Sequence, residues 1–181
     1  MRKILKATLW LILPALALSA CTILSPASLT EAQNAARTEN RELILATAAI
    51  NIAGGTAQAP GVSPLLKAQI KAGVASFSDA VQAQVASAHN GGDVTSQAMA
   101  GLIGAVEGGV PNIGGLLASA HGSSVTPEEL AVAGGVSALS QLPSIAGLLA
   151  NDLNPSFVPS DAVLGADLTN LQNAAAAVAK E

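Results

Sequence analysis

Two histidines, His89 and His121, are the side chains of this sequence best suited to metal binding or acid–base chemistry. Each follows the tripeptide Ala-Ser-Ala, and the two lie 32 residues apart. A metal site would need both imidazoles close together with a carboxylate such as that of Asp93 beside them. The expected alternative is that each imidazole caps the negative end of a helix dipole, worth about 0.3–1 kcal/mol when it is charged. We predict the second role and no metal ligand.

Nucleophilic and phosphate-binding patterns are also missing from the sequence. Ser119, Ser123 and Ser124 flank His121 but form no nucleophile elbow, and serine is an ordinary turn residue. The acids Glu128 and Glu129 are typical of a first helical turn. Neither GxxxxGK[ST] nor GxGxxG occurs. We therefore predict no catalytic residue, no cofactor and no enzymatic activity.

The chain begins with the features of an export signal. A basic start at residues 1–3, with Arg2 and Lys3, precedes an apolar run at 4–17. This run is too short to span a bilayer, which takes a helix of about 20 residues. Small residues then lead through Ala20 to Cys21, the only cysteine. One interpretation is an ordinary signal peptide followed by a free thiol. The pattern more closely resembles the lipobox of bacterial lipoproteins.

This resemblance covers residues 1–21 and implies how the chain is processed. Cleavage between Ala20 and Cys21 would make Cys21 the first mature residue and the site of lipid attachment. The next residue is Thr22 rather than Asp, which is similar to lipoproteins that enteric bacteria send to the outer membrane. We expect an exported protein, lipid-anchored to the envelope and facing the periplasm.

The composition of the mature chain excludes several kinds of partner. Removing residues 1–20 takes away three of the eight basic residues and none of the twelve acids, so the formal charge changes from −4 to −7. Such a chain lacks the clustered basic residues that nucleic acids require. Only Phe77 and Phe157 remain as aromatic residues, which disfavours carbohydrate platforms and base-stacking surfaces.

The sequence predicts helices and no strand. After a tether at 21–27, Ser28-Leu29-Thr30-Glu31 has the capping-box pattern of a helix start. This helix should end near Ala53, before Gly54-Gly55. Because its first half is polar and its second half apolar, we expect a solvated stalk near the membrane that leads into a buried half.

The remaining chain repeats with a period of about 32 residues. Residues 111–118 match residues 143–150, and Ser or Thr opens each unit at Ser63, Thr95 and Thr126, with a last unit near Ser160. Residues 28–181 are therefore predicted to form one all-α domain, an up-and-down bundle of about five Ala/Gly-rich helices.

Two of these helices should be kinked or broken, because Pro111 and Pro143 each remove a helical hydrogen bond. If each unit were two short helices, the chain would instead form a small helical-hairpin solenoid. The apolar periodicity also predicts the core, which comprises Leu43, Ile50, Leu66, Ile70, Val74, Phe77, Val81, Val85, Leu102, Val106, Leu116, Leu130, Val136, Leu139, Leu148, Leu164, Leu168 and Leu171.

These features predict a non-catalytic, lipid-anchored envelope protein that acts as a structural or interaction component. Its expected partners are the membrane, through the lipid, and either an envelope protein or a second copy; nucleic acid is excluded. Two alternatives remain. One is a membrane-perturbing protein built on the nearly uncharged stretch 98–120, with glycines at Gly104 and Gly108. The other is a carrier of small lipophilic ligands in a cavity of the bundle.

Overall fold

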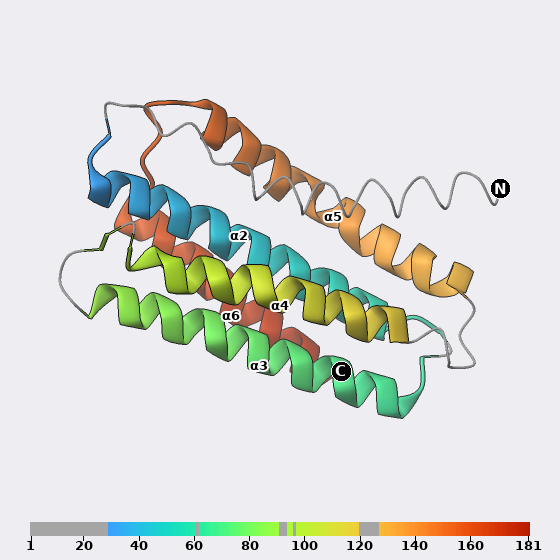
Figure 1. The fold of residues 1–181 in the computed structure, drawn as a ribbon. Helices are drawn as coiled ribbons and strands as arrows, with labels where there is room; N and C mark the ends of the chain where they lie inside the picture. Colours follow the sequence, from blue (N-terminus) through green and yellow to red (C-terminus); the bar gives the residue numbers. More distant parts are fainter. Residues whose placement is uncertain (1–28, 61, 91–93, 96, 120–126) are drawn as a thin grey trace.

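The protein is an up-and-down bundle of helices. The computed structural model describes residues 29–60, 62–90, 94–95, 97–119 and 127–181, with side chains outside 110–138 and 152. Successive helices run in alternating directions (Figure 1). They are α2 (Glu31–Ala57), α3 (Pro64–His89), α4 (Met99–Ser119), α5 (Pro127–Leu153) and α6 (Asp161–Lys180). The all-α prediction is confirmed, and the described residues contain no strand.

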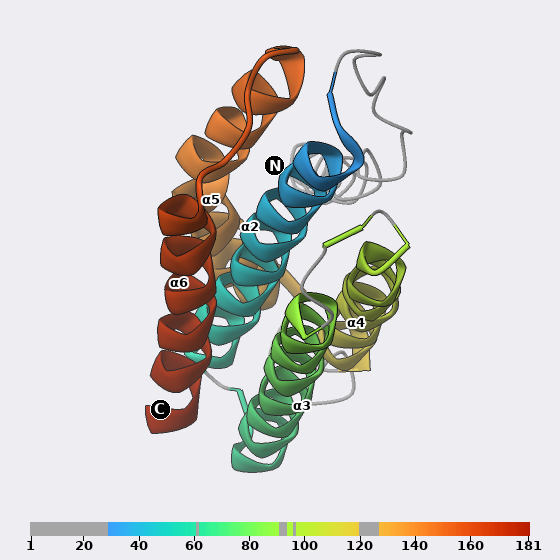
Figure 2. The same ribbon diagram turned by 90° about the vertical axis from the view of Figure 1, so that its left-hand side faces the viewer.

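Helix α2 is the centre of the bundle. It packs against α3, α4, α5 and α6, whereas α5 packs chiefly against α2. Figure 2 shows α2 between the α3–α4 pair on one side and α5 and α6 on the other. Its alanines Ala35, Ala46 and Ala53 are fully buried, so neighbouring helices can approach it closely on all sides.

The two helices that were predicted to be kinked or broken are not broken. Pro111 and Pro143 each lie inside one continuous helix, α4 and α5. Pro143 is exposed, so the carbonyl group that loses its helical hydrogen bond there can bond to water instead. Because each repeat forms one helix, the hairpin-solenoid alternative is wrong.

Helix starts agree with the sequence at Ser63 and Ser160 and differ at the first helix. Thr95 Oγ1 accepts from the Ala98 amide just before α4, and Thr126 lies outside the described residues. The hydroxyls of Ser63 and Ser160 accept hydrogen bonds from the backbone three residues on, as predicted. The first helix begins two residues later than the predicted box. Thr30 is its N-cap, and the Gln33 side chain accepts from the Thr30 amide at 2.8 Å, so Gln33 rather than Glu31 completes the box.

The end of α2 also differs from the prediction. Gly54 and Gly55 lie inside the helix, which continues to Ala57. A Cβ atom on Gly54 would come within 2.6 Å of Cγ2 of Val178 on α6. Glycine is present here because α6 crosses so closely, and not because the helix must stop.

Most of the predicted core is buried. The confirmed residues are Leu43, Ile50, Leu66, Ile70, Val74, Phe77, Val81, Val85, Leu102, Val106, Leu148, Leu164 and Leu171. Leu168 is partly buried against them. Leu139 was predicted wrongly: it is 60% exposed, because its side of α5 faces no other helix. The side chains of Leu116, Leu130 and Val136 lie outside the described residues.

Adjacent glycines in α4 test this close packing. A Cβ atom on Gly109 would clash with the ring of Phe77, whereas one on Gly108 meets nothing within 4 Å. Gly109→Ala should lower the free energy of unfolding by about 1–3 kcal/mol through overpacking. Gly108→Ala should raise it by up to about 1 kcal/mol through helix propensity. Thermal unfolding followed by circular dichroism measures both, and equal effects of the two substitutions would contradict the packing described.

Candidate functional site

The polar first half of α2 is buried, which corrects the predicted solvated stalk. Arg37, Glu39, Asn40 and Glu42 are all at most 6% exposed. The periodicity indicated a polar helix correctly but could not show that other helices surround it. A polar segment at the centre of a bundle is stable only when each buried group has a hydrogen-bond partner.

Partners for these groups come from three other helices or their ends. Both carboxylate oxygens of Glu39 lie 2.9 and 3.1 Å from Nε2 of His89, at the end of α3. The Asn40 amide donates to Oδ2 of Asp167 on α6 at 2.6 Å. The Arg37 guanidinium donates to the carbonyl of Asn151, on α5, at 3.5 Å, and to that of Pro155 beyond it at 3.4 Å.

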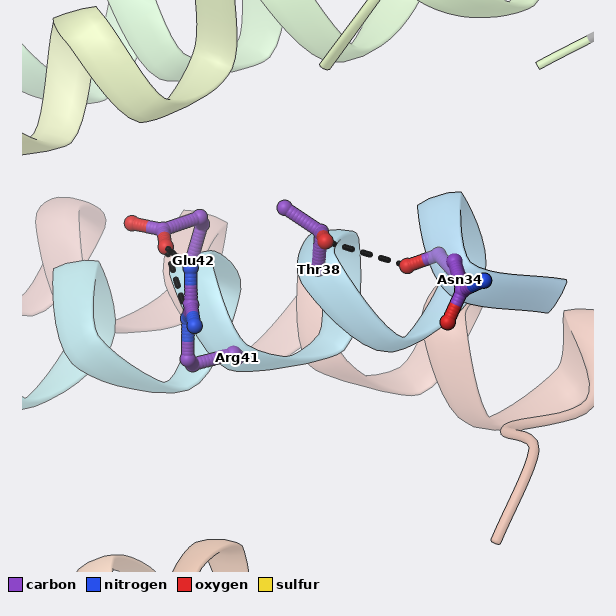
Figure 3. Close-up of polar contacts among 4 residues, drawn as sticks. All are labelled: Asn34, Thr38, Arg41 and Glu42. Carbon is purple, nitrogen blue, oxygen red and sulfur yellow. Dashed lines mark hydrogen bonds and ion pairs between the residues drawn. The ribbon is translucent and has the colours of Figure 1, made fainter. Parts of the chain in front are cut away.

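Other polar groups of α2 are satisfied within the helix itself. Thr38 Oγ1 donates to the carbonyl of Asn34 at 3.0 Å, and Arg41 donates from Nε to Oε1 of Glu42 at 2.9 Å (Figure 3). In the part of the chain with described side chains, no buried side-chain nitrogen or oxygen lacks a partner. This cluster therefore presents internal hydrogen bonds rather than unpaired groups aimed at a substrate.

Few of the residues singled out from the sequence can be placed. His89 is the last residue of α3, as predicted, but its carboxylate neighbour is Glu39 and not Asp93. Residues 20–22, 93 and 120–126 lie outside the described part of the chain. Cys21, His121, Ser123 and Ser124 are among them. Among described residues, no group of three or more His, Cys, Asp or Glu could hold a metal ion.

Two open clefts lie beside α2, between α5 and α6. One of about 320 Å³ is lined by Asn51, Gly54, Gly55, Gln58, Ser140, Gln141, Ala174, Ala177, Val178 and Glu181. A second of about 220 Å³ is lined by Ile44, Thr47, Gln141, Ser144, Gly147, Leu148, Asn151, Asp167 and Asn170. Asn51 donates to Gln141 at 3.1 Å, at the boundary of the two. Amides and hydroxyls are among the lining residues of both clefts.

The carboxyl group of Asp167, which lines the second cleft, has a shifted pKa. Burial raises its pKa above the ordinary 3.8, and the hydrogen bond from Asn40 partly opposes the shift. In the folded protein this acid therefore holds its proton to a higher pH than in the unfolded chain.

The outer side of α5 carries large exposed apolar side chains. Leu139, Leu142, Leu149 and Leu153, which we call the leucine face, are 60%, 53%, 52% and 82% exposed. Their spacing places them on one side of the helix, away from α2. The sequence did not indicate this face, because leucine at helical spacing is typical of a core.

Comparisons with known proteins and the search for membrane spans add no assignment. No family model, curated protein or solved structure matches this chain. Among the described helices, none is long and apolar enough to cross a membrane.

Replacing Asp167 tests the pH dependence of stability. Because folding raises the pKa of Asp167, its carboxyl group binds more protons in the folded state than in the unfolded state at pH values above 3.8. The contribution of Asp167 to the free energy of unfolding therefore falls as the pH rises from 3.8 through the pKa of the folded state. Asp167→Asn should remove this loss and leave the melting temperature at pH 7 equal or higher. Asp161→Asn, which removes a carboxylate from the first turn of the same helix, should lower it slightly. A lower melting temperature at pH 7 for Asp167→Asn than for Asp161→Asn would contradict this account.

A double-mutant cycle tests the pair between Glu39 and His89. Because Glu39 is buried but half of the His89 side chain is exposed, we expect a coupling free energy of about 0.5–1 kcal/mol from Glu39→Gln and His89→Ala. The exposed Glu107 on α4 supplies a control: Glu107→Gln should be additive with His89→Ala. Chemical denaturation measures both cycles, and equal coupling in the two would show that the pair contributes nothing specific.

Proposed function

We propose that this chain is a lipid-anchored protein of the bacterial envelope that acts without catalysis, as a structural or interaction component. The observation that carries the interaction role is the leucine face of α5. Exposed apolar side chains that gather on one surface, rather than lying singly, often mark a contact with another macromolecule.

The distribution of side-chain size supports this role. The centre of the bundle contains many buried alanines, while four leucines remain exposed on α5. Fully burying a leucine contributes roughly 1.5–3 kcal/mol, so leaving four of them in water forgoes a large part of the stabilisation that the chain could have. A partner that covers the leucine face would recover this free energy.

The lipid anchor follows from the lipobox-like sequence before Cys21 and is consistent with the start of the bundle. Thr30, the N-cap of α2, lies nine residues after Cys21. Fully extended, such a segment reaches at most about 30–32 Å. A lipid on Cys21 would therefore hold the bundle close to the membrane, and Thr22 favours the outer membrane with the protein facing the periplasm.

Neither alternative function has a comparable observation in its favour. The membrane-perturbing hypothesis depends on residues 98–120, yet Met99, Leu102 and Val106 of this stretch are buried in the bundle core. The lipophilic-carrier hypothesis needs a cavity that encloses most of the ligand, whereas both clefts beside α2 are open to solvent.

The anchor is tested by moving the chain behind an ordinary secretory signal and replacing Cys21 with Ser. This protein should appear in the soluble periplasmic fraction, whereas the native chain should fractionate with membranes, because only the native chain carries the lipid. Fractionation followed by immunoblotting measures the difference. Membrane retention of the unlipidated chain would contradict the anchor.

The interaction role is tested by crosslinking in cells. Leu149→Ser with Leu153→Ser should abolish the main crosslinked product of the lipidated protein. Leu65→Ser is the control, because Leu65 is 71% exposed but lies on α3. Unchanged crosslinking of the double variant would rule out the leucine face as the contact surface.

A further inference from the structure

We infer that the leucine face pairs with the same face of a second copy of this chain, α5 against α5. This inference deepens the proposed function, because it names the partner of the interaction component. Two properties of α5 carry it: the spacing of its exposed apolar residues and the lack of charge over residues 130–151. The small area that these residues offer then predicts how strongly the two copies pair.

The spacing on α5 is that of a coiled-coil seam. Leu139, Leu142, Ala146, Leu149 and Leu153 are separated by three, four, three and four residues, and all five are exposed. This is a strict heptad pattern of a and d positions, the narrow stripe with which one helix packs against another. A helix that only contributes to its own bundle has no use for such a seam on its outer side.

The composition of α5 favours a helical partner over a lipid surface. Helices that lie in a membrane interface carry Lys or Arg on the polar side and often Trp or Phe on the apolar side. Helix α5 contains no Lys, Arg, Trp or Phe, and residues 130–151 include no charged residue at all. The helix therefore has neither the cations nor the aromatic anchors of an interfacial helix.

The same lack of charge points to a second copy as the partner. In coiled coils, charged residues beside the seam select the partner and reject the wrong one. Three of the positions beside the seam, Pro143, Ile145 and Ala150, are uncharged, and the fourth, Asp152, lies near the end of the helix. No charge between residues 130 and 151 repels an identical helix, and a two-fold axis through the seam would bury the same leucines from both copies.

The exposed area predicts that pairing is weak until the chains are confined. The exposed fractions of the four leucines amount to about two and a half side chains per copy. At roughly 100 Å² of apolar surface per leucine, two copies bury about 500 Å² in leucine, well below the ~1,200 Å² of a stable interface. Two chains anchored in one membrane meet at a high effective concentration, which strengthens a weak contact. This step rests on the proposed lipid anchor.

Disulfide crosslinking at the middle of the seam tests the inference. Ala146 lies at the centre of the five seam positions, so a two-fold axis through the middle of the seam places it close to Ala146 of the second copy. Since Cys21 is the only cysteine and is acylated in the anchored protein, Ala146→Cys introduces one free thiol. Mild oxidation of membranes should convert most of this variant to a disulfide-linked dimer. Ala72→Cys, at an exposed position of α3, should give at least about tenfold less.

Like charges placed in the seam distinguish a specific contact from chance collision. Leu142→Glu with Leu149→Glu should reduce dimer formation by Ala146→Cys about tenfold or more, because four carboxylates would face one another. Leu65→Glu should leave it unchanged. Circular dichroism should show that both variants remain helical. If Ala146→Cys forms no more dimer than Ala72→Cys, the self-pairing is overturned.

Two further outcomes separate this inference from the proposed function. A crosslink from the thiol of the Ala146→Cys variant to a different protein would overturn self-pairing and leave the interaction role standing. Protection of that thiol from a water-soluble maleimide without any dimer would overturn self-pairing and assign the face to the lipid surface instead.

Removing the lipid tests the dependence on anchoring. In the unlipidated chain the dimer should fall at least about tenfold at equal protein concentration. An equal dimer yield there would overturn the dependence on anchoring, while failure of the chain to reach the membrane would overturn the anchor alone.

Discussion

The fold depends on burying the polar first half of α2. This helix is surrounded by the other four, so the side chains of Arg37, Glu39, Asn40 and Glu42 are shielded from bulk water and must be bonded inside the bundle. Glu39 contacts His89 of α3, Asn40 bonds to Asp167 of α6, and Arg37 bonds to the carbonyl of Asn151 on α5. Each of these bonds fixes a different helix against α2. Because an unpaired buried charge costs several kcal/mol, a helix displaced from its place would leave its partner on α2 unsatisfied.

Small side chains are the second constraint, and they act in the other half of α2. Ala46 and Ala53 are buried there, and Gly54 lies too close to Val178 for any side chain to fit. Such contacts place helix axes close together, so dispersion between backbones partly replaces the burial of large side chains. The bundle is thus specified by hydrogen bonds at one end of α2 and by shape at the other.

The sequence alone predicts much of this fold, and two of the predictions that failed, the solvated stalk and the burial of Leu139, have one cause. Periodicity locates the helices and most of the core, and local patterns are enough to find the caps Ser63 and Ser160. What local patterns do not contain is which helix is central. A polar helix with an apolar continuation looks like a stalk when its neighbours are unknown, and Leu139 looks like core for the same reason. The pairing of Glu39 with His89, 50 residues apart, has no local signature.

The position of α5 connects this asymmetry to function. Each of the four helices around α2 has one side against which it packs on α2. Helix α3 also contacts α4 and α6, whereas α5 packs chiefly against α2. Its opposite side is left to whatever lies outside the bundle. A helix in that place would normally be polar on its outer side, but α5 has leucines there at heptad spacing and no charged residue between residues 130 and 151. The exposed seam is therefore a property that the fold permits but does not require. The residues that form it contribute little to packing within one chain, and a second helix would give them the neighbours that the bundle does not.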